Sequence, residues 1–280
     1  MSAKKILAIV ISYYPEKDLL VSNINSFIDY VDKVIIWENT PFEERLKYRF
    51  YNHENVEYCG DELNSISHAL NYGWRYAKDN HYDYLLTMDQ DSQWGDGFGR
   101  YLECTVLDPD APIGLWGPVV NNFNKGIADY EETENLITSG MLMPIDIVDR
   151  IGGWNEFFTI DSVDTEFCLR AWSKGIPVYQ INKCNLNQRF GLPKLASFMG
   201  HKVDLRNDSP LRLYNIYRNF LILSRLFPKR KTFREKFYKG WIRRIKWILL
   251  FEDNRVKKIS AIVRGLCSGL FVNLQDVRKN

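Results

Sequence analysis

The sequence predicts an α/β protein with a mainly parallel, Rossmann-like central sheet flanked by helices and a basic helical appendage at its C-terminal end. Short β-branched runs alternate with stretches of helical periodicity. One strand and one helix together take roughly thirty residues, the length of a βαβ repeat. After Pro210 the composition changes to Lys and Arg interleaved with aromatic and aliphatic residues. With 280 residues, 45% of them hydrophobic, the chain has enough apolar material for a large domain with such an appendage.

The first ninety residues carry the βαβ pattern. The runs 5–12 and 33–39 are short, β-branched and bounded by turn residues, as in strands that are buried on both faces. Between them, the segment 18–31 has apolar residues at helical spacing. A second helix is expected over 65–80, and it leads into a third strand over 82–88. This order predicts parallel strands joined by helices on the faces of the sheet.

The pattern continues less regularly after the third strand, where Gly, Pro and Asn are frequent. A strand is expected over 112–120, and a strand followed by a short helix within 136–154. A helix over 162–175 and a late strand over 176–188 complete the predicted α/β part.

The cysteines and the N-terminus indicate a cytoplasmic protein. The five cysteines are scattered without a CxxC pair, which favours a reducing compartment over a disulfide framework or a zinc site. The apolar run at the N-terminus is about eight residues long, too short for a signal peptide, and reads better as a buried strand. No segment of the sequence approaches the roughly 18 apolar residues that a membrane span needs.

Two aspartates stand where the third strand should end. The run YDYLLTM is followed directly by Asp89, Gln90 and Asp91. In an open α/β sheet the ligand crevice lies beyond the carboxyl ends of the strands. Paired carboxylates there suit a hard divalent cation that also takes phosphate oxygens. In the alternative interpretation, one aspartate caps the following turn and the other is solvated.

Several segments, in this order and spacing, resemble the rhamnosyltransferase-like branch of glycosyltransferase family 2. They are ILAIVISYYP, VIIWENTP, NSISHALNYGWRYAKDNHYDYLLTMDQDS, LITSGMLMPIDIVDRIGGWNEFFTIDSVDTEFCLRAWSKG and SPLRLYNIYRN, spread over roughly residues 5 to 220. The resemblance implies the GT-A fold and an inverting transfer of sugar. It implies a catalytic domain over 1–210, and the change of composition after Pro210 indicates a basic amphipathic helical region over 211–280.

By position, the resemblance implies a donor site. Asp89 and Asp91 match the family's Asp-x-Asp motif, which holds Mg²⁺ or Mn²⁺ on the diphosphate, where the metal acts as a Lewis acid on the leaving group. In the family's donor-binding stretch, the first asparagine is usually followed by glycine; in this chain Asn64 is followed by Ser65. The residues expected to bind the donor nucleotide are Ser12, Tyr13, Glu38, Asn39, Asn64, Asn71 and Asp89.

An inverting transfer also needs a base that takes the proton from the acceptor hydroxyl. Asp164 falls where the family places its catalytic aspartate, at the start of a helix, and is our first choice; Asp161 is the second. By sequence alone Asp164 is also a good helix N-cap, and the two roles are compatible. Glu166 either binds the acceptor or pairs with Arg170.

Other residues are weaker candidates for contacts with the sugar or the acceptor. Ser139 and Gly140 precede an interior strand, where the family brings the backbone close to its substrates; tight packing is the alternative. Trp94 either stacks on a sugar or belongs to the core. Trp154 either lines the acceptor site or belongs to the core.

One position departs from the family. Many relatives carry an H-x-x-G pattern whose histidine joins the metal site, and here the text is QRFG, with Gln188 in place of the histidine and Gly191 retained. A carboxamide is a weaker metal ligand than imidazole. Either the aspartates and the diphosphate hold the metal, or Gln188 bonds the donor directly, or Arg189 supplies charge in its place. Gln188 therefore stays among the candidate sugar-binding residues.

The region 211–280 suggests a partner surface. The formal net charge of the whole chain is only +2, so any basic surface is local. Basic amphipathic helices with Trp241 and Trp247 suit the anionic inner face of a membrane; the alternative is a helical cap with solvated charges. We expect no nucleic-acid partner, because no nucleic-acid-binding signature accompanies these residues.

Together these observations predict an inverting, metal-dependent glycosyltransferase. It would move L-rhamnose from dTDP-L-rhamnose to a hydroxyl of a glycan or lipid-linked glycan in bacterial surface-polysaccharide synthesis. The alternatives are the same reaction with another donor, such as a UDP-linked hexose or furanose, and a catalytically silent protein that binds glycan or assembles with other enzymes. A nucleotidyltransferase is disfavoured because no glycine-rich phosphate loop is found near the N-terminus.

Overall fold

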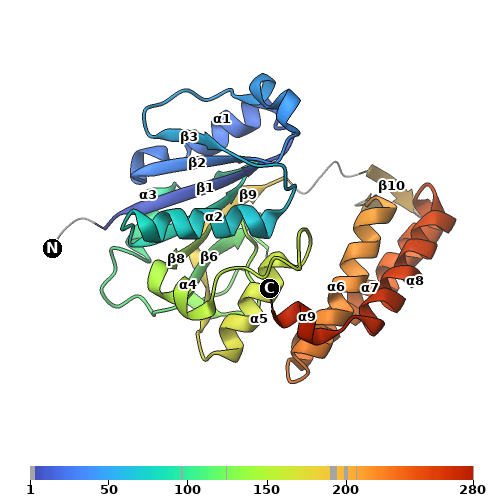
Figure 1. Cartoon of the computed structure of the whole chain (residues 1–280). Helices are drawn as coiled ribbons and strands as arrows, with labels where there is room; N and C mark the ends of the chain where they lie inside the picture. The colour runs from blue at the N-terminus through green and yellow to red at the C-terminus, as the bar shows by residue number, and fades with distance from the viewer. Residues whose placement is uncertain are drawn as a thin grey trace. The chain divides into compact units, whose positions relative to one another are not determined.

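The computed structural model of the protein describes residues 4–95, 97–123, 125–189, 194–198, 201–205 and 207–279 (Figure 1). The chain divides into two compact units. The first unit comprises Met1–Thr159 and Val163–Gln188, and the second comprises Ile160–Ser162 and Arg189–Asn280. Each is described by itself.

The first unit is built on a sheet in which the described strands follow the order β3-β2-β1-β4-β8-β6-β9-β5. The predicted parallel strands are confirmed as β1 (Ile6–Ser12), β2 (Lys33–Glu38) and β4 (Tyr84–Asp89). The short strand β3 (Val56–Cys59), which we did not predict, extends the parallel part beyond β2.

The rest of the sheet is mixed. Strand β8 (Met141–Pro144) runs antiparallel to β4 on one side and to β6 (Leu115–Val120) on the other. Strand β9 (Val178–Gln188) is parallel to β6, whereas β5 (Ser92–Trp94) and β7 (Tyr130–Glu132) pair with β9 in the antiparallel direction. All five of these strands are therefore antiparallel to at least one neighbour, which the repeating βαβ pattern did not suggest.

Helices cover both faces of this sheet, as the side chains of the parallel strands require. Strand β1 is buried at every residue, and its two sets of alternating side chains need apolar cover on each face. On one face lie α1 (Lys17–Asn25) and α3 (Phe98–Glu103), and on the other lies α2 (Ile66–Asp79), with α4 (Ile145–Ile151) packed beside it. The close contact of α2 is visible at Gly73, where an added Cβ would come within 2.8 Å of Ile9.

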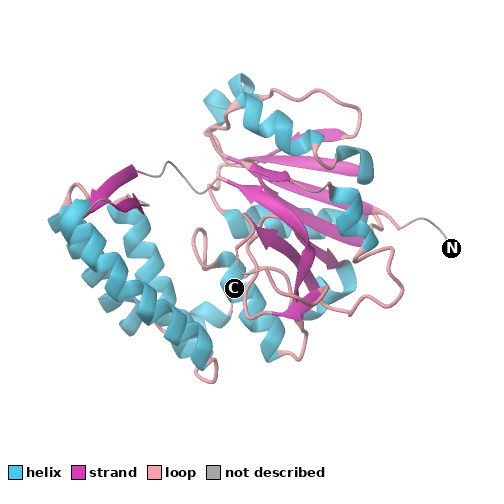
Figure 2. Ribbon diagram, turned by 180° about the vertical axis from the view of Figure 1, so that it is seen from behind, coloured by secondary structure: helices cyan, strands magenta, loops and turns pink. Residues whose placement is uncertain are grey.

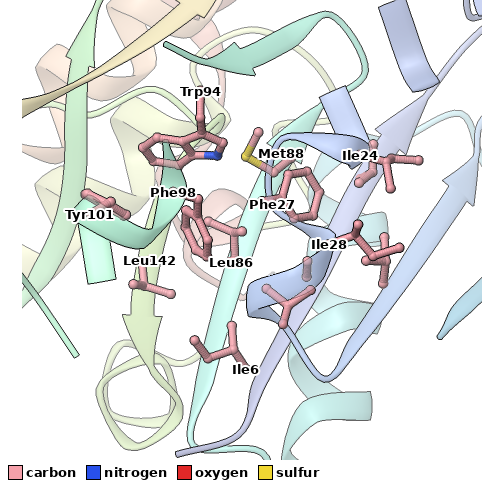
Figure 3. Close-up of a cluster of buried hydrophobic side chains, with 14 of the residues drawn as sticks. Ile6, Ile24, Phe27, Ile28, Leu86, Met88, Trp94, Phe98, Tyr101 and Leu142 are labelled. Atoms are coloured by element: carbon pink, nitrogen blue, oxygen red, sulfur yellow. The ribbon is translucent and has the colours of Figure 1, made fainter. Parts of the chain in front are cut away.

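The larger apolar cluster lies between the sheet and α1 and α3. Figure 3 shows Phe27, Trp94 and Phe98 packed over Leu86 and Met88 of β4. We expected the first helix to run over 18–31, but α1 ends at Asn25. The Ser26 hydroxyl donates to the carbonyl of Asn23, one of the local bonds by which serine competes with a continuing helix.

The second unit is helical, as the sequence predicts for its basic segment (Figure 2). A hairpin of β10 (Lys194–Phe198) and β11 (His201–Leu205) precedes α6 (Pro210–Leu226), α7 (Lys231–Phe251), α8 (Arg255–Phe271) and α9 (Leu274–Arg278). Helix α6 begins with Ser209 as N-cap and Pro210 in its first turn. Over the described chain, no helix combines the length and the apolar character needed to cross a bilayer.

Glycine brings α8 close to α6. A Cβ at Gly265 would come within 2.4 Å of the carbonyl oxygen of Tyr214, and one at Gly269 within 2.5 Å of that of Arg218. Leu213, Tyr217, Ile248 and Ile262 are buried between α6, α7 and α8. The helices of this unit therefore have an apolar core of their own.

Candidate active site

Three candidate residues lie at the same edge of the sheet because their strands are parallel and in register. Ser12 pairs with Glu38, and Ile11 pairs with Asp89, so Ser12, Glu38 and Asp89 end β1, β2 and β4 at one level. This is the carboxyl edge, where open α/β sheets bind ligands. The structure thus brings the predicted metal ligand beside the predicted nucleotide-binding residues.

Asp89 is held from three directions. Its amide donates to the hydroxyl of Ser139 at 3.0 Å, and its carbonyl accepts a bond from the side chain of Asn23. Its carboxylate oxygen Oδ2 accepts a hydrogen bond of 2.7 Å from Nε2 of Gln188, at the end of β9. The position of Asp89 is therefore shared between β4, α1, β9 and the segment before β8.

The carboxylates of Asp89, Asp91 and Asp164 influence one another. Burial, together with the negative charges of Asp91 and Asp164, raises the pKa of Asp89 to about 7, although the bond from Gln188 opposes the shift. A bound divalent cation would relieve this repulsion, so the charge pattern fits Mg²⁺ or Mn²⁺. Within the described ranges, no three His, Cys, Asp or Glu side chains are grouped to hold a metal by themselves. Ligand oxygens would have to complete the coordination.

This raised pKa predicts a pH-dependent cost in stability. The ordinary carboxyl pKa is 3.8 and that of Asp89 is about 7, so between these values the folded state retains a proton that the unfolded state has lost. Stability therefore falls as pH rises through this window, and the cost is complete above pH 7. We expect Asp89→Asn to raise the free energy of unfolding at pH 8 by on the order of 2 kcal/mol, allowing for partial exposure of the side chain, and to change little at pH 4.

Urea titrations in EDTA, followed by tryptophan fluorescence, would test this expectation. Asp83→Asn is the control with the opposite sign: burial raises the pKa of Asp83, but the Lys5 amide and the Lys4 ammonium more than offset this and lower it overall. Asp83→Asn should therefore destabilise the protein at pH 8. Equal stability of wild type and Asp89→Asn at pH 8 would contradict the raised pKa.

Asp164 lies in the first turn of α5 (Val163–Ser173), as predicted. It is the second residue of the helix and not the N-cap, because α5 begins at Val163. Its Oδ1 accepts a hydrogen bond of 2.7 Å from the amide of Thr165. A helix N-terminus stabilises an ionised carboxylate at this position. Asp164 is also near enough to Asp89 to raise its pKa.

The two acids beside Asp164 have different surroundings. Glu166 is buried and makes a two-bond ion pair with Arg170, at 2.8 and 2.9 Å, and Arg170 also donates to the carbonyls of Ile151 and Gly153. Of the two alternatives for Glu166, the structure shows the pair with Arg170. Asp161 belongs to the second unit, where its carboxylate accepts a bond from Arg212.

The residues predicted for the base and ribose lie at the edge, but two of them already have partners. Glu38 is buried and pairs with Arg49, at 2.8 Å between Oε2 and Nη2. Asn39 accepts a bond from the indole of Trp37 at 3.1 Å. Tyr13 is 49% exposed, so its ring is the group at this edge that is most open to a ligand.

Three other predicted residues occupy structural positions away from solvent. The amide of Asn71 donates to the Trp154 carbonyl and to Glu156, and its carbonyl accepts from the Trp154 amide at 2.7 Å. Trp154 is buried and stacks on Phe167. Trp94 is 5% exposed and packs on Phe98 and Tyr101. Both tryptophans are core residues in this structure, and Asn71 holds the segment around Trp154.

Three remaining predictions are placed as follows. Ser139 is fully buried and donates to the hydroxyl of Ser92 at 2.6 Å, besides accepting from Asp89. Gly140 has a φ of +80° and contacts Pro118 closely, which explains a glycine there by packing. Asn64 is exposed ahead of α2. Gly191 lies outside the described residues.

Three residues that support the site were not predicted from the sequence. Gln90 makes two hydrogen bonds with the backbone of Tyr13, accepting from its amide at 2.6 Å and donating to its carbonyl at 3.1 Å. Asn23, on the buried face of α1, contacts Asp89. Asn121 holds the backbone of Gln188 by two bonds, at 2.8 and 2.9 Å. Only Asn23, a polar residue on an otherwise apolar helix face, could have been singled out from the pattern.

Comparison with known proteins agrees with this arrangement. No family model matches the chain. The dTDP-rhamnosyl transferase RfbF of Shigella flexneri is 26% identical over 245 residues, which cover 79% of this chain and 80% of RfbF. This similarity confirms the resemblance to rhamnosyltransferases.

Two solved structures share the fold. The chain matches a TarS fragment from S. aureus in complex with UDP-GlcNAc with a TM-score of 0.56 and 13% identity, covering 94% of this chain and 81% of the fragment. It matches GalNAc-T7 with UDP, GalNAc and Mn²⁺ with a TM-score of 0.56 and 10% identity, covering 78% of this chain. The match spans about half, 47%, of the length of the GalNAc-T7 chain. The predicted GT-A fold is confirmed, and the comparisons together support a nucleotide-sugar glycosyltransferase.

Proposed function

We propose that the chain is an inverting, metal-dependent glycosyltransferase that moves L-rhamnose from dTDP-L-rhamnose to a hydroxyl of a glycan or lipid-linked glycan acceptor. The observation that carries the proposal is the group of interacting carboxylates, Asp89, Asp91 and Asp164, at the carboxyl edge of a GT-A sheet. The choice of donor rests on the similarity to RfbF, which is named as a dTDP-rhamnosyl transferase. The reaction would serve surface-polysaccharide synthesis at the cytoplasmic face of the membrane.

Asp89 and Asp91 are the residues that would hold Mg²⁺ or Mn²⁺. The pKa of Asp89 is raised first by burial and then by the negative charges of Asp91 and Asp164, which a bound cation would offset. The GalNAc-T7 structure, which shares the fold, contains Mn²⁺. When bound, the metal would supply Lewis-acid stabilisation of the nucleoside diphosphate leaving group. Gln188 is suited to orient the Asp89 carboxylate, since its Nε2 donates to Oδ2.

Asp164 is the proposed base. It would accept the proton of the acceptor hydroxyl as the oxygen attacks the anomeric carbon, on the face opposite the leaving group. Its place in the first turn of α5 suits a negatively charged carboxylate, because a helix N-terminus favours negative charge. Ser12 and Tyr13, with Glu38 and Asn39, would face the nucleotide at the strand edge, while Trp94 and Asn71 are left out of the proposed contacts because they are packed in the interior.

Calorimetric titration with dTDP, UDP and GDP, each with and without Mn²⁺, tests the donor site directly. Binding of dTDP that requires Mn²⁺ would support the proposal, and binding of UDP alone would shift the donor to a UDP-sugar. Transfer from dTDP-L-rhamnose to a glycan acceptor would then establish the reaction. If no nucleotide bound under any condition, the alternative of a silent glycan-binding or assembly protein would replace the enzyme.

The proposed lipid-linked acceptor agrees with a membrane-binding surface on the helical unit. Residues 211–280 hold 18 Lys and Arg and four Asp and Glu, a formal charge of +14, whereas residues 1–210 carry −12. On α8, Val256, Val263 and Leu270 are exposed at intervals of seven, beside the basic residues Lys257 and Arg264. An exposed apolar stripe with basic neighbours is the pattern of helices that lie on anionic lipid.

We expect this surface to bind vesicles that contain anionic lipid. Each basic residue near such a surface contributes about 1 kcal/mol, so the double variant Lys257→Glu, Arg264→Glu should bind vesicles of 30% phosphatidylglycerol at least tenfold more weakly, as measured by co-sedimentation. Lys47→Glu, at an exposed lysine of the first unit, is the matched control and should bind like wild type. Equal binding of wild type to neutral and anionic vesicles, or none to either, would refute the membrane surface.

A further inference from the structure

The turn Ile160–Ser162 has an unusual backbone. Asp161 and Ser162 have φ values of +56° and +67°, which place two consecutive non-glycine residues in the left-handed region. This conformation is unfavourable for a non-glycine residue, and it persists only where its surroundings impose it. The turn is followed directly by α5, whose second residue is Asp164. Its geometry therefore sets how the chain enters the helix that carries the proposed base.

Contacts from α6 hold this turn. The side-chain amide of Asn219 donates to the carbonyl of Asp161 at 2.9 Å and to that of Ile160 at 3.2 Å. Nε of Arg212 donates to Oδ1 of Asp161 at 3.2 Å. By its contacts the turn belongs to the helical unit, although its chain neighbours on both sides belong to the sheet unit. We refer to Asn219, Arg212 and Asp161 as the turn clamp.

The clamp is itself fixed by a buried set of charges within the helical unit. Arg212 approaches the carboxylate of Asp208 at 3.6 Å, and Arg244 pairs with Asp208 at 3.2 Å. Arg244 and Lys258 both pair with Glu252, whose side chain is fully buried. Buried charges of this kind are costly unless they are paired, so their positions are well defined. Asn219 is likewise buried, at 2% exposure.

We propose that the turn clamp is a positioning device for the proposed base, in which Arg212, Asn219 and Asp161 hold the chain so that Asp164 faces the acceptor hydroxyl. The inference rests on the proposed function, in which Asp164 takes the proton. In this proposal Asp161 is a positioning residue and no longer the second candidate for the base.

Arg212→Ala and Asn219→Ala test the clamp. A shift of about 1 Å at a reacting group can cost about 100-fold in rate, so each variant should lower kcat by 10- to 100-fold. The Kd for the nucleotide with Mn²⁺ should stay within twofold of wild type, because Asp89 and Asp91 are untouched. Arg212→Lys, which keeps the charge, should fall between wild type and Arg212→Ala. Arg150→Ala, at an exposed arginine of α4, is the control and should keep the wild-type kcat.

A rescue experiment separates positioning from loss of stability. Ser162→Gly removes the left-handed cost at φ +67°, so the turn needs less support, and the double variant Arg212→Ala, Ser162→Gly should recover much of the lost kcat. A merely structural role of Arg212 would not be restored by glycine in the turn. Thermal melting shows which variants are folded. Because the Arg212 side chain is exposed, Arg212→Ala should disturb the fold less than Asn219→Ala.

Hydrogen exchange provides a readout that does not depend on sugar transfer. The amides of residues 160–166 should exchange at least tenfold faster in Arg212→Ala and Asn219→Ala than in wild type. Unchanged exchange there, or wild-type kcat in both folded variants, would overturn the clamp. If wild type transferred no sugar while the exchange still increased, the clamp would hold the turn as described, and the proposed function would be the part that failed.

Discussion

Replacing Asp164 by Asn is expected to lower kcat by at least about 1,000-fold while leaving the Kd for dTDP and Mn²⁺ within about twofold of wild type. The amide cannot accept the proton of the acceptor hydroxyl, yet it has nearly the shape of the carboxylate and can still accept the bond from the Thr165 amide. The loss should therefore fall on the chemical step. Single-turnover transfer and calorimetric binding of the nucleotide measure the two quantities separately.

Asp146→Asn is the matched control for this variant. Asp146 is the second residue of α4, as Asp164 is the second residue of α5, and its side chain is exposed. Both substitutions remove a carboxylate from a helix N-terminus, so a general effect on the helix would appear in both. Wild-type kcat in Asp164→Asn would exclude Asp164 as the base and return Asp161 to consideration.

Replacing Asp91 by Asn is expected to abolish the Mn²⁺-dependent part of nucleotide binding, a loss of at least about 100-fold in affinity if the metal bridges protein and diphosphate. Asp89 is avoided here because its side chain accepts a hydrogen bond from Gln188, so that its replacement would also remove a contact within the protein. In EDTA, wild type and Asp91→Asn should bind dTDP equally weakly. Titration of each protein with dTDP at fixed Mn²⁺ gives the comparison.

The control for this variant is Asp110→Asn, which removes an exposed carboxylate remote in sequence from the proposed site. It should bind dTDP and Mn²⁺ like wild type, which would show that the loss of one negative charge does not by itself weaken binding. Retained Mn²⁺ dependence in Asp91→Asn would show that the metal is held elsewhere, and the assignment of the Asp89 and Asp91 pair would fall.

The sequence predicted those elements whose pattern is dominated by burial. Strands β1, β2 and β4 are apolar runs covered on both faces, and their observed bounds differ from the expected ones by one or two residues. The end of β4 at Asp89 was predicted for the same reason, since a carboxylate pair interrupts an apolar run where the strand leaves the core. Asp164 was also placed correctly, in the first turn of a helix.

What the sequence did not predict depends on contacts between distant segments. The antiparallel direction of β8 follows from its pairing with β4 and β6, which no local pattern records. Asn71 was expected at the donor because of its position in the second helix, yet it bonds Trp154, a residue 83 positions away in the sequence. The bond from Gln188 to Asp89 joins residues 99 positions apart. Such pairings depend on the folded structure and leave no periodic pattern in the sequence.

The two hydrogen bonds between Gln90 and Tyr13 have a consequence for how donor preference can change. Both bonds use the backbone of Tyr13, so they tie β1 to the aspartate pair without involving the tyrosine ring. If the proposed donor site is correct, a substitution at position 13 would alter the surface offered to the nucleobase while the two carboxylates keep their places. The choice of nucleotide could then diverge separately from the chemistry at the diphosphate, because Gln90, between the two aspartates, bonds only the backbone of Tyr13.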